Sequence, residues 1–464
     1  MSGPLRGITW RAAALIVCEA AVILGSVYLA AYIRLAPAAT DSWAWADGIL
    51  PKALLIAITT QLCMYFADLY DFAVLSDRRE VFVRAVHAIA ITSLLLGVVY
   101  FWIPDLVVGR GVFIIASGLM MTFLFGWRLI FEWTTRNVAP RERLLLVGTS
   151  DGAVNLAREL YRRSDIGVDI VGFIDPDPAR VGTPILNPGV IGTLDDIPAI
   201  VRARAVDRVV VSLADARGKL PVDKLLEMKL DGVTFDHLAS VYEEYTGKIA
   251  VDNLRPSWLI FSEGFRKSHV QLATKRALDV VAAATGLIVA MPLMLLVAVA
   301  VRLSSRGPVL YHQSRVGLRG RVFTLHKFRS MRTDAEQRTG AVWAQANDPR
   351  VTGVGRVLRR TRLDELPQLW NVLRGDMSLV GPRPERPEFV SSLTRDIRFY
   401  GQRHIVRPGL TGWAQVLYSY GASVEDAMEK LQYDLFYIKN MSLALDLFII
   451  AKTVKTVLGG RGAQ

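Results

Sequence analysis

The sequence predicts a membrane protein that combines a helical bundle with α/β parts. Hydrophobic residues make up 52% of the 464 residues and are concentrated in long blocks. Charged residues make up only 21%, and the formal net charge is +12. A chain of this length usually folds as more than one unit. We therefore expect three domains, at residues 1–140, 141–265 and 266–464.

Four apolar segments open the chain. A helix needs about 20 residues to cross a bilayer, and each segment has close to that length. They cover residues 12–33, 50–70, 85–103 and 112–131. We therefore expect a four-helix transmembrane bundle within residues 1–140. Glu19 lies inside the first segment, where a charge can mark function, but we expect it to face the other helices.

Basic residues between these segments predict the orientation of the bundle. They fall on alternate connections, namely Arg6 and Arg11, then Arg78, Arg79 and Arg84, then Arg136, Arg141 and Arg143. Because Lys and Arg favour the cytoplasmic side, both ends of the bundle are expected to face the cytoplasm. The soluble parts that follow would then lie on the cytoplasmic face.

A small α/β domain is predicted at residues 141–265. RLLLVGTSDGAVNLAREL gives a buried strand, a glycine turn and a helix, and VDIVGFID gives a second strand. This order resembles half of a Rossmann unit, but the glycine pattern is degraded, because Ser150 and Ala153 follow Gly148 at the later glycine positions. Ser150 would hinder the close approach of a pyrophosphate. We expect a structural or regulatory domain, with cofactor binding as the alternative.

An uncharged apolar run at residues 280–301 decides the topology of the C-terminal domain. As a helix it is long enough to span a bilayer, but crossing would place the two flanking soluble regions on opposite sides of the membrane. Pro292 lies midway, where it removes a backbone donor and predicts a kink. Since a bent helix can enter and leave the same leaflet, we expect a re-entrant helix rather than a kinked span.

The most informative motifs lie between Gly307 and Asp446. They are GPVLYHQSRVGLRGRVFTLHKFRSM, TRLDELPQLWNVLRGDMSLVGPRPERPEF, RPGLTGWAQV and YDLFYIKNMSLALDL. Their order over residues 270–460 resembles the bacterial sugar transferase family, the polyprenyl-phosphate hexose-1-phosphate transferases or monotopic phosphoglycosyl transferases. The preceding spans and degenerate Rossmann unit resemble the large exopolysaccharide-initiating members. The stretch from TRLDELPQLWNVL to GASVEDAMEKLQYD most resembles members of exosortase (PEP-CTERM) systems. The resemblance also supports a monotopic catalytic domain with a re-entrant helix.

Adjacent carboxylates at Asp364 and Glu365 precede Pro367, which fits the first turn of the helix PQLWNVL. At a helix N-terminus, the partial positive charge and free amides favour ionised carboxylates and bound phosphate. An acidic helix cap is the common alternative for such a pair. Nearby basic residues favour a functional site, because they are suited to binding a diphosphate. They are Lys327, Arg329, Arg359, Arg360 and Arg383.

The resemblance implies that Asp364 is a nucleophile. It would attack the phosphate next to the sugar of a UDP-sugar, release UMP and form an aspartyl phosphosugar, which polyprenyl (undecaprenyl) phosphate then attacks. Because the donor is anionic, we expect Mg²⁺ held by Asp364 and Glu365, since this ion bridges phosphates through one or two carboxylates. Glu365 would hold the metal or orient the acceptor. The family pattern gives phosphate contacts first to Lys327 and Arg383.

The segment RPGLTGWAQ predicts a nucleotide-facing loop, with a tight surface turn as the alternative. Its candidate residues are Arg407, Gly409, Thr411 and Gly412. Asp434 is expected either to orient a basic side chain or to cap a helix. The six histidines show no zinc spacing and are assigned no catalytic role.

The sequence disfavours three other classes of protein. A membrane-bound nucleotide-sugar dehydratase or epimerase would need a second glycine-rich fingerprint and a Tyr-x-x-x-Lys pair, and the sequence contains neither. A scaffold for polysaccharide assembly would leave Asp364 replaceable. A nucleic-acid binder would carry soluble basic stripes instead of five apolar segments.

The expected partners are therefore a UDP-sugar, polyprenyl phosphate and membrane lipid, and no nucleic acid. The expected location is the bacterial inner membrane. A homodimer formed through the middle domain is compatible with the sequence, which shows no interface. The motifs do not specify the sugar.

Overall fold

A computed structural model gives the fold of the chain, which divides into two compact units between Leu238 and Ala239. The structure describes residues 10–36, 48–70, 78–137, 141–162, 167–212, 222–251, 262, 264–333, 335, 348–418, 421 and 423–458. Arg6, which contributed to the predicted orientation, lies outside these residues.

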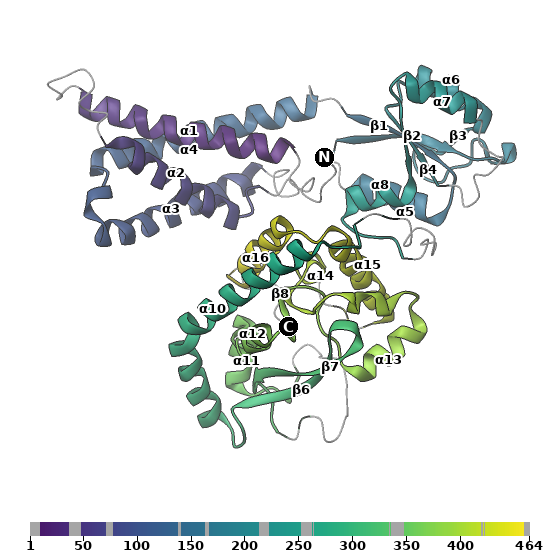
Figure 1. The fold of residues 1–464 in the computed structure, drawn as a ribbon. Helices are drawn as coiled ribbons and strands as arrows, with labels where there is room; N and C mark the ends of the chain where they lie inside the picture. The colour runs from purple at the N-terminus through teal and green to yellow at the C-terminus, as the bar shows by residue number, and fades with distance from the viewer. Residues whose placement is uncertain are drawn as a thin grey trace. The chain divides into compact units, whose positions relative to one another are not determined.

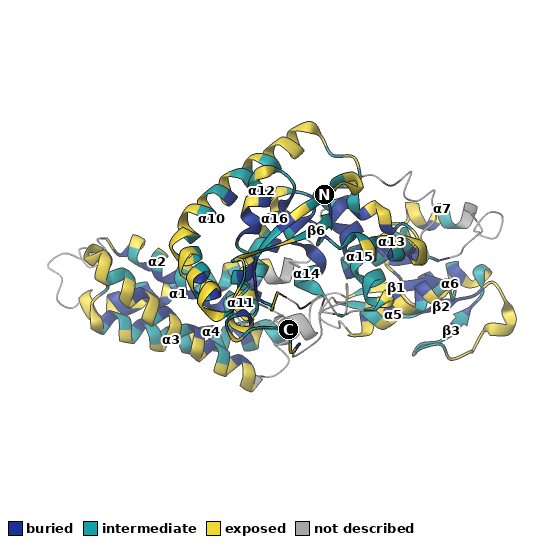
Figure 2. Cartoon of the chain, turned by 90° about the horizontal axis from the view of Figure 1, so that it is seen from below, coloured by how far each residue is buried: buried dark blue, intermediate teal, exposed yellow. Residues whose placement is uncertain are grey.

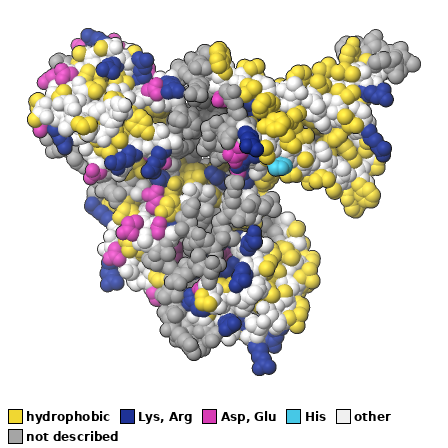
Figure 3. All heavy atoms as spheres, turned by 180° about the vertical axis from the view of Figure 1, so that it is seen from behind, with side chains coloured by type: hydrophobic (Ala, Val, Ile, Leu, Met, Phe, Trp, Pro, Cys, Tyr) yellow, Lys and Arg dark blue, Asp and Glu magenta, His cyan; other side chains and the backbone are white. Residues whose placement is uncertain are grey.

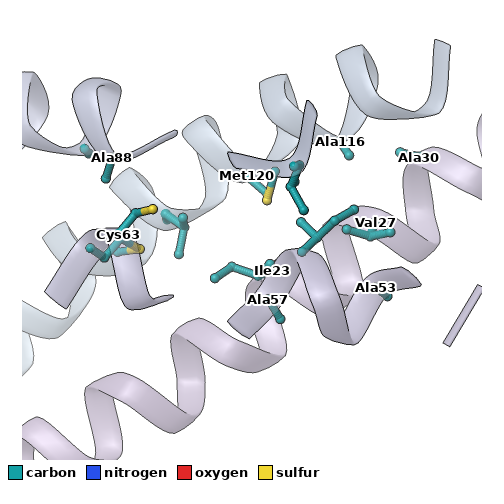
Figure 4. Packing of buried hydrophobic residues seen from close by; sticks show 14 of the residues in the cluster. Ile23, Val27, Ala30, Ala53, Ala57, Cys63, Ala88, Ala116 and Met120 are labelled. Carbon is teal, nitrogen blue, oxygen red and sulfur yellow. The ribbon is translucent and has the colours of Figure 1, made fainter. Parts of the chain in front are cut away.

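Four long helices begin the N-terminal unit (Figure 1). They are α1 (Trp10–Leu35), α2 (Ile49–Phe66), α3 (Arg78–Trp102) and α4 (Arg110–Asn137), with a short 3-10 turn η4 (Pro104–Leu106) between α3 and α4. Each is long and apolar enough to cross a membrane. They pack around one buried apolar cluster to which all four contribute, as Val27, Ala53, Ala88 and Met120 illustrate (Figure 4). The apolar helices predicted for this part of the chain are therefore confirmed.

A buried ion pair joins the first and fourth helices. Arg128 donates from Nε to Glu19 Oε1 at 2.7 Å, and from Nη1 to the carbonyl oxygen of Leu69 at 2.9 Å. Both charged side chains are buried. An unpaired charge in apolar surroundings is costly, so the pair is favourable only while α1 and α4 lie side by side. This arrangement confirms that Glu19 faces the other helices.

A five-stranded parallel sheet with the strand order β3-β2-β1-β4-β5 follows the helices. Its strands are β1 (Glu142–Val147), β2 (Val168–Ile174), β3 (Val190–Gly192), β4 (Arg208–Val211) and β5 (Thr234–His237). The connecting helices are α5 (Asp151–Arg162), α6 (Ile197–Ala203) and α7 (Val222–Leu230), with 3-10 turns η6 (Pro178–Arg180) and η7 (Leu194–Asp196). Helices as crossovers between neighbouring parallel strands confirm the predicted α/β domain.

The glycine turn that the sequence predicted follows β1. Gly148 has φ +105°, which favours glycine. Ser150 Oγ forms a hydrogen bond with Ser212 Oγ, which follows β4, and also accepts from the amide of Ala153 at 3.3 Å. Ser150 thus connects the carboxyl ends of two neighbouring strands.

The C-terminal unit begins earlier than the boundary predicted near residue 265. Helix α8 (Leu238–Thr246) and the residues after it contact elements from the far end of the sequence. Lys439 forms an ion pair with Glu243 at 2.6 Å, and Trp413 Nε1 donates to the carbonyl oxygen of Gly247 at 2.9 Å. Because these contacts join residues 239–251 to the C-terminal unit, the boundary lies at Leu238.

The remaining elements of this unit surround the candidate site. They are α10 (His269–Ser304), β6 (Leu310–Val316), η8 (Leu318–Gly320), β7 (Val322–Phe328), α11 (Gly353–Thr361), η9 (Leu363–Glu365), α12 (Gln368–Arg374), β8 (Ser378–Val380), α13 (Pro387–Asp396), η10 (Tyr400–Ile405), β9 (Gly409–Thr411), α14 (Trp413–Leu417), α15 (Val424–Asn440) and α16 (Leu443–Leu458). Strands β6 and β7 form an antiparallel hairpin, and β8 pairs with β9 in parallel.

Helix α10 contains the apolar run with Pro292 and extends beyond it at both ends. It is curved, and its outward side is exposed (Figures 1 and 2). Its first half contacts the C-terminal unit through Arg276, whose Nη1 donates to the carbonyl oxygen of Val372 at 2.6 Å. Its second half packs Val301 against Phe328. Both halves therefore contact the same unit, while hydrophobic side chains between them remain exposed (Figure 3).

Candidate active site

A cavity of about 630 Å³ lies inside the C-terminal unit. Its walls come from β6, β7, the turn η9, η10, α14 and α15, and from residues 381–384, which we call the GPRP segment. Among the described residues that line it, eleven are Lys or Arg and four are Asp or Glu. This excess of positive charge favours an anionic ligand, such as one that carries phosphates.

Asp364 and Glu365 lie on the wall of this cavity, in the turn η9 between α11 and α12. Arg362 ends α11 in the left-handed region with φ +58° and so redirects the chain into η9. Leu363 and Leu366, on either side of the pair, pack into apolar clusters beneath the turn. The two flanking leucines therefore anchor η9 and leave both carboxylates at the cavity.

The local backbone differs from the predicted helix N-terminus. Helix α12 begins at Gln368, and Pro367 precedes it. The amide of Glu365 donates to the carbonyl oxygen of Arg362 at 3.1 Å, so it is not available to a phosphate. The positive charge around the carboxylates therefore comes mainly from side chains.

Glu365 is held by two arginines. Arg383 donates from Nη2 to Glu365 Oε1 at 3.0 Å, and Arg362 donates from Nη1 to the same oxygen at 3.4 Å. Burial alone would raise the pKa of Glu365, but the charges of Arg383, Lys327 and Arg362 together lower it to about 2. Glu365 is therefore ionised at neutral pH.

Asp364 is in a different electrostatic state from its neighbour. Its side chain is buried, and Oδ1 has no hydrogen-bond partner among the described residues. Burial and the charge of Glu365 raise the pKa of Asp364 to about 6, although Lys327 and Arg359 oppose this shift. Asp364 is thus mostly ionised at neutral pH, and it lines the cavity with one buried oxygen that lacks a hydrogen-bond partner among the described residues.

Lys327 enters the site from β7, where it lies opposite Tyr311 of β6. Tyr311, Gln313 and Arg315 also line the cavity, because alternate residues of a strand face the same side. Burial and the neighbouring arginines lower the pKa of Lys327 to about 8. The sequence analysis missed Arg315, although the alternation in LYHQSRV is a pattern that could have identified it.

The other two predicted phosphate-binding arginines differ from each other. Arg359 lines the cavity and donates from Nε to Ser330 Oγ at 3.0 Å. Arg329 is buried, and its guanidinium donates to the carbonyl oxygens of Ser305 at 2.7 Å and Arg306 at 3.1 Å. Arg329 also lines the cavity. Its N–H groups stabilise the end of α10, which gives it a structural role, and phosphate binding by Arg329 stays a prediction.

We expect Arg329→Lys to lower the free energy of unfolding by about 2 kcal/mol, because one ammonium cannot replace the fork of hydrogen bonds at the end of α10. Thermal unfolding of the full chain in detergent measures this loss. Arg356→Lys, on the exposed side of α11, is the matched control and should change stability little. Unchanged stability of Arg329→Lys together with weaker binding of pyrophosphate would instead support the phosphate-binding role.

The segment RPGLTGWAQ forms the short strand β9 and the start of α14, and it reaches the cavity only through Ala414 and Gln415 among the described residues. The four predicted nucleotide-binding residues, Arg407, Gly409, Thr411 and Gly412, are not among the described residues that line the cavity. Gly409 and Thr411 belong to β9, which lies so close to Gly381 that a Cβ at Gly409 would collide with its backbone. Arg407 donates from Nε to the carbonyl oxygen of Gly375 at 3.0 Å. The glycines therefore serve strand packing.

Asp434 orients a basic side chain, which is the first of its two predicted roles. Arg403 donates from Nε and Nη2 to Asp434 Oδ2 at 3.0 and 2.7 Å, and both side chains are buried at the cavity wall. Arg403 was not predicted from the sequence, because a lone arginine in QRHIV carries no recognisable pattern.

Comparison with known proteins identifies the family. Residues 270–460 match the family described as bacterial sugar transferase, and residues 65–227 match a CoA-binding domain. The UDP-glucose:undecaprenyl-phosphate glucose-1-phosphate transferase of Xanthomonas campestris pv. campestris is 36% identical over 335 residues, which cover 69% of this chain and 68% of that protein. The chain belongs to the bacterial sugar transferase family. This bacterial sugar transferase is therefore an enzyme that transfers a phosphate-linked group.

Two further relatives of this sugar transferase differ in length and in name. The UDP-N-acetylgalactosamine-undecaprenyl-phosphate N-acetylgalactosaminephosphotransferase of Aeromonas hydrophila is 47% identical over 49% of this chain, and the match covers 53% of its own length. The exopolysaccharide production protein PSS of Rhizobium leguminosarum bv. phaseoli is 41% identical over 41% of this chain and 97% of its own length. Because the names of the relatives specify different sugars, family membership does not identify the sugar.

Proposed function

We propose that this sugar transferase moves a sugar 1-phosphate from a UDP-sugar to undecaprenyl phosphate and releases UMP, as the first membrane step of exopolysaccharide assembly. The observation that carries the proposal is Asp364, a buried carboxylate with an unpartnered oxygen in a cavity lined by cations. The names of the relatives from Xanthomonas and Rhizobium support the donor, the acceptor and the pathway.

In the proposed first step, a carboxylate oxygen of Asp364 attacks the phosphorus next to the sugar. The bond from this phosphorus to the bridging oxygen breaks, and UMP leaves with that oxygen and the bonding electron pair. An acyl phosphate that carries the sugar remains on Asp364. Lys327, Arg359 and Arg383 offset the negative charge that would otherwise repel the attacking carboxylate.

In the proposed second step, a phosphate oxygen of undecaprenyl phosphate attacks the same phosphorus. The bond to Asp364 breaks, its carboxylate is regenerated, and the lipid diphosphate sugar leaves. A phosphate monoester has a second pKa near about 6, so the acceptor is already largely ionised at neutral pH. We infer that Glu365 acts mainly in holding the metal or orienting the acceptor, because no strong base is required.

Magnesium fits this site by the chemistry of its donors. Asp364 Oδ1 has no partner among the described residues, and ionised Glu365 lies next to it in the chain. The described residues contain no group of three or more His, Cys, Asp or Glu placed for a metal, but Mg²⁺ needs only one or two carboxylates beside phosphates and waters. Bound there, it would neutralise the donor phosphates.

We further propose that α10 is a re-entrant helix that holds the cavity at the cytoplasmic surface of the inner membrane. Three features support this: Pro292 lies within the helix, both halves contact one unit, and exposed hydrophobic side chains such as Val289 and Leu296 lie between those contacts. The carrier phosphate lies at the same depth of the membrane. The alternating basic connections of the bundle support the cytoplasmic orientation.

The proposal is tested with the purified full chain in detergent, with Mg²⁺, undecaprenyl phosphate and a panel of UDP-sugars. We expect UMP release with at least one sugar and a lipid diphosphate sugar as the product. Without the acceptor, a single burst of UMP should accompany the labelling of the protein by the sugar phosphate. Failure of every UDP-sugar to yield UMP would contradict the proposed function.

We expect the burst of UMP to depend on the protonation of Asp364. Because burial and Glu365 raise the pKa of Asp364 to about 6, its nucleophilic form is lost as the pH falls through that value. The burst rate should decline about tenfold for each pH unit below 6 and should level off above 7. Rapid-quench measurements between pH 4.5 and 8 test this, with thermal unfolding at each pH as the control. A decline that begins only near pH 4 would contradict it.

A further inference from the structure

A buried hydrogen-bond network connects α15 with the GPRP segment. Arg403 Nη2 donates to Asp434 Oδ2 at 2.7 Å and also to the backbone carbonyl oxygen of Arg383 at 3.1 Å. Its Nη1 donates to the hydroxyl of Tyr400 at 2.6 Å. Arg403 is 5% exposed and Asp434 is 1% exposed. The orientation of the guanidinium is therefore set by two partners, Asp434 and Tyr400, in addition to its bond to Arg383.

The same network extends to the carboxylate pair through the side chain of Arg383, whose Nη2 contacts Glu365 Oε1 at 3.0 Å. The backbone of the segment is held at a second point, because Arg315 Nη1 donates to the carbonyl oxygen of Pro384 at 2.9 Å. Two consecutive carbonyls are thus fixed by two arginines. The prolines on either side of Arg383 further restrict the backbone.

We propose that Arg403 and Asp434 are positioning residues that act through Arg383 to hold Glu365 in place beside Asp364. The inference rests on the proposed function, because the site that they position is the one at which the sugar phosphate would be transferred. Neither residue needs to touch the substrate for this effect. The fork of Arg403 matters because Nε and Nη2 bind Asp434 while Nη1 reaches Tyr400 and Nη2 also reaches the carbonyl oxygen of Arg383, which a lysine cannot do.

A second buried aspartate in the same unit provides a matched control. Asp446 on α16 is 1% exposed, pairs with Lys275 at 2.7 Å and accepts from the hydroxyl of Tyr437 at 2.7 Å. It is not among the described residues that line the cavity. Asp434 and Asp446 therefore share burial, a cationic partner and a helical location, but only Asp434 connects with Arg383.

The experiment compares Asp434→Asn with Asp446→Asn in the full chain. For Asp434→Asn we expect kcat for UMP release to fall about 10- to 100-fold, with KM for the UDP-sugar changed less than about threefold. The decline at acid pH should move upward by about one pH unit, because a displaced Arg383 leaves the carboxylate pair more easily protonated. The charged groups that face Glu365 are Lys327, Arg362, Asp364 and Arg383.

Asp446→Asn should lower the thermal midpoint and leave both kcat and the acid decline unchanged. Arg403→Lys keeps the positive charge beside Asp434 but loses the fork, so it should reproduce the upward shift. Arg403→Lys therefore tests the positioning role by itself if Asp434→Asn fails to fold. In a protein that already carries Arg383→Lys, Asp434→Asn should lower kcat by less than about a further twofold, because the two substitutions disrupt the same connection.

Folded Asp434→Asn or Arg403→Lys proteins with the wild-type kcat and acid decline would overturn the inference. Equal effects of Asp434→Asn and Asp446→Asn on the pH profile would also overturn it, because they would show a general loss of fold. A wild-type protein that releases no UMP with any UDP-sugar would count against the proposed function instead, so the two failures are distinguishable.

Discussion

Asp364→Asn is expected to lower the rate of UMP release by at least about 1,000-fold, because a neutral amide cannot act as the proposed nucleophile. The fold should survive. Burial and Glu365 raise the pKa of Asp364 above the value of an unfolded aspartate, so ionisation of Asp364 above about pH 6 destabilises the native state. Removal of that charge should therefore leave stability at neutral pH equal or higher.

Rapid-quench UMP release and the trapping of labelled protein measure this effect, and thermal unfolding measures stability. Asp396→Asn, an exposed aspartate at the end of α13, is the matched control and should behave as wild type. A sugar-phosphate adduct that persists in Asp364→Asn would count against the two-step scheme, and so would the absence of an adduct from the wild type.

Glu365→Gln is expected to reduce turnover about 100-fold and to increase the Mg²⁺ concentration needed for half-maximal activity. A glutamine cannot balance the charge of Arg383, which lies 3.0 Å from Glu365, and is a weaker ligand for Mg²⁺. The substitution also removes one of the two causes that raise the pKa of Asp364. The acid decline of the burst should therefore move to lower pH, opposite to the shift expected for Asp434→Asn.

Magnesium titrations and pH profiles of the same protein test both expectations. Glu227→Gln, which changes an exposed glutamate of α7 in the N-terminal unit, serves as the control. If Glu365→Gln lost activity that a higher pH restored in full, with an unchanged dependence on magnesium, then Glu365 would be a general base and not a residue that holds metal or orients the acceptor.

Hydropathy and motif order were sufficient to predict much of the architecture and part of the site. Long apolar runs predicted α1 to α4 and the apolar part of α10, because helix length in a membrane is set by the bilayer. The motifs also identified Lys327, Arg359 and Arg383, which the fold brings to one cavity with Asp364. Local patterns succeeded where a residue type and its neighbours define the chemistry.

The remaining features depend on contacts between residues distant in the sequence. The position of Arg329 in KFRSM does not reveal that its guanidinium stabilises the end of α10. The glycines of RPGLTG predict close approach, but only the pairing of β8 with β9 shows that the approaching group is Gly381. Likewise, the domain boundary lies at Leu238 and not near residue 265, because α8 contacts Lys439, almost 200 residues later in the sequence.

The ion pair between Glu19 and Arg128 also imposes an order on the biosynthesis of the chain. The two residues are 109 positions apart, so at about 5–20 residues per second the ribosome adds Arg128 several seconds after Glu19. During that interval the nascent first helix carries an uncompensated carboxylate, which resists release into lipid. The ion pair that stabilises the bundle can therefore form only after the fourth helix has been synthesised.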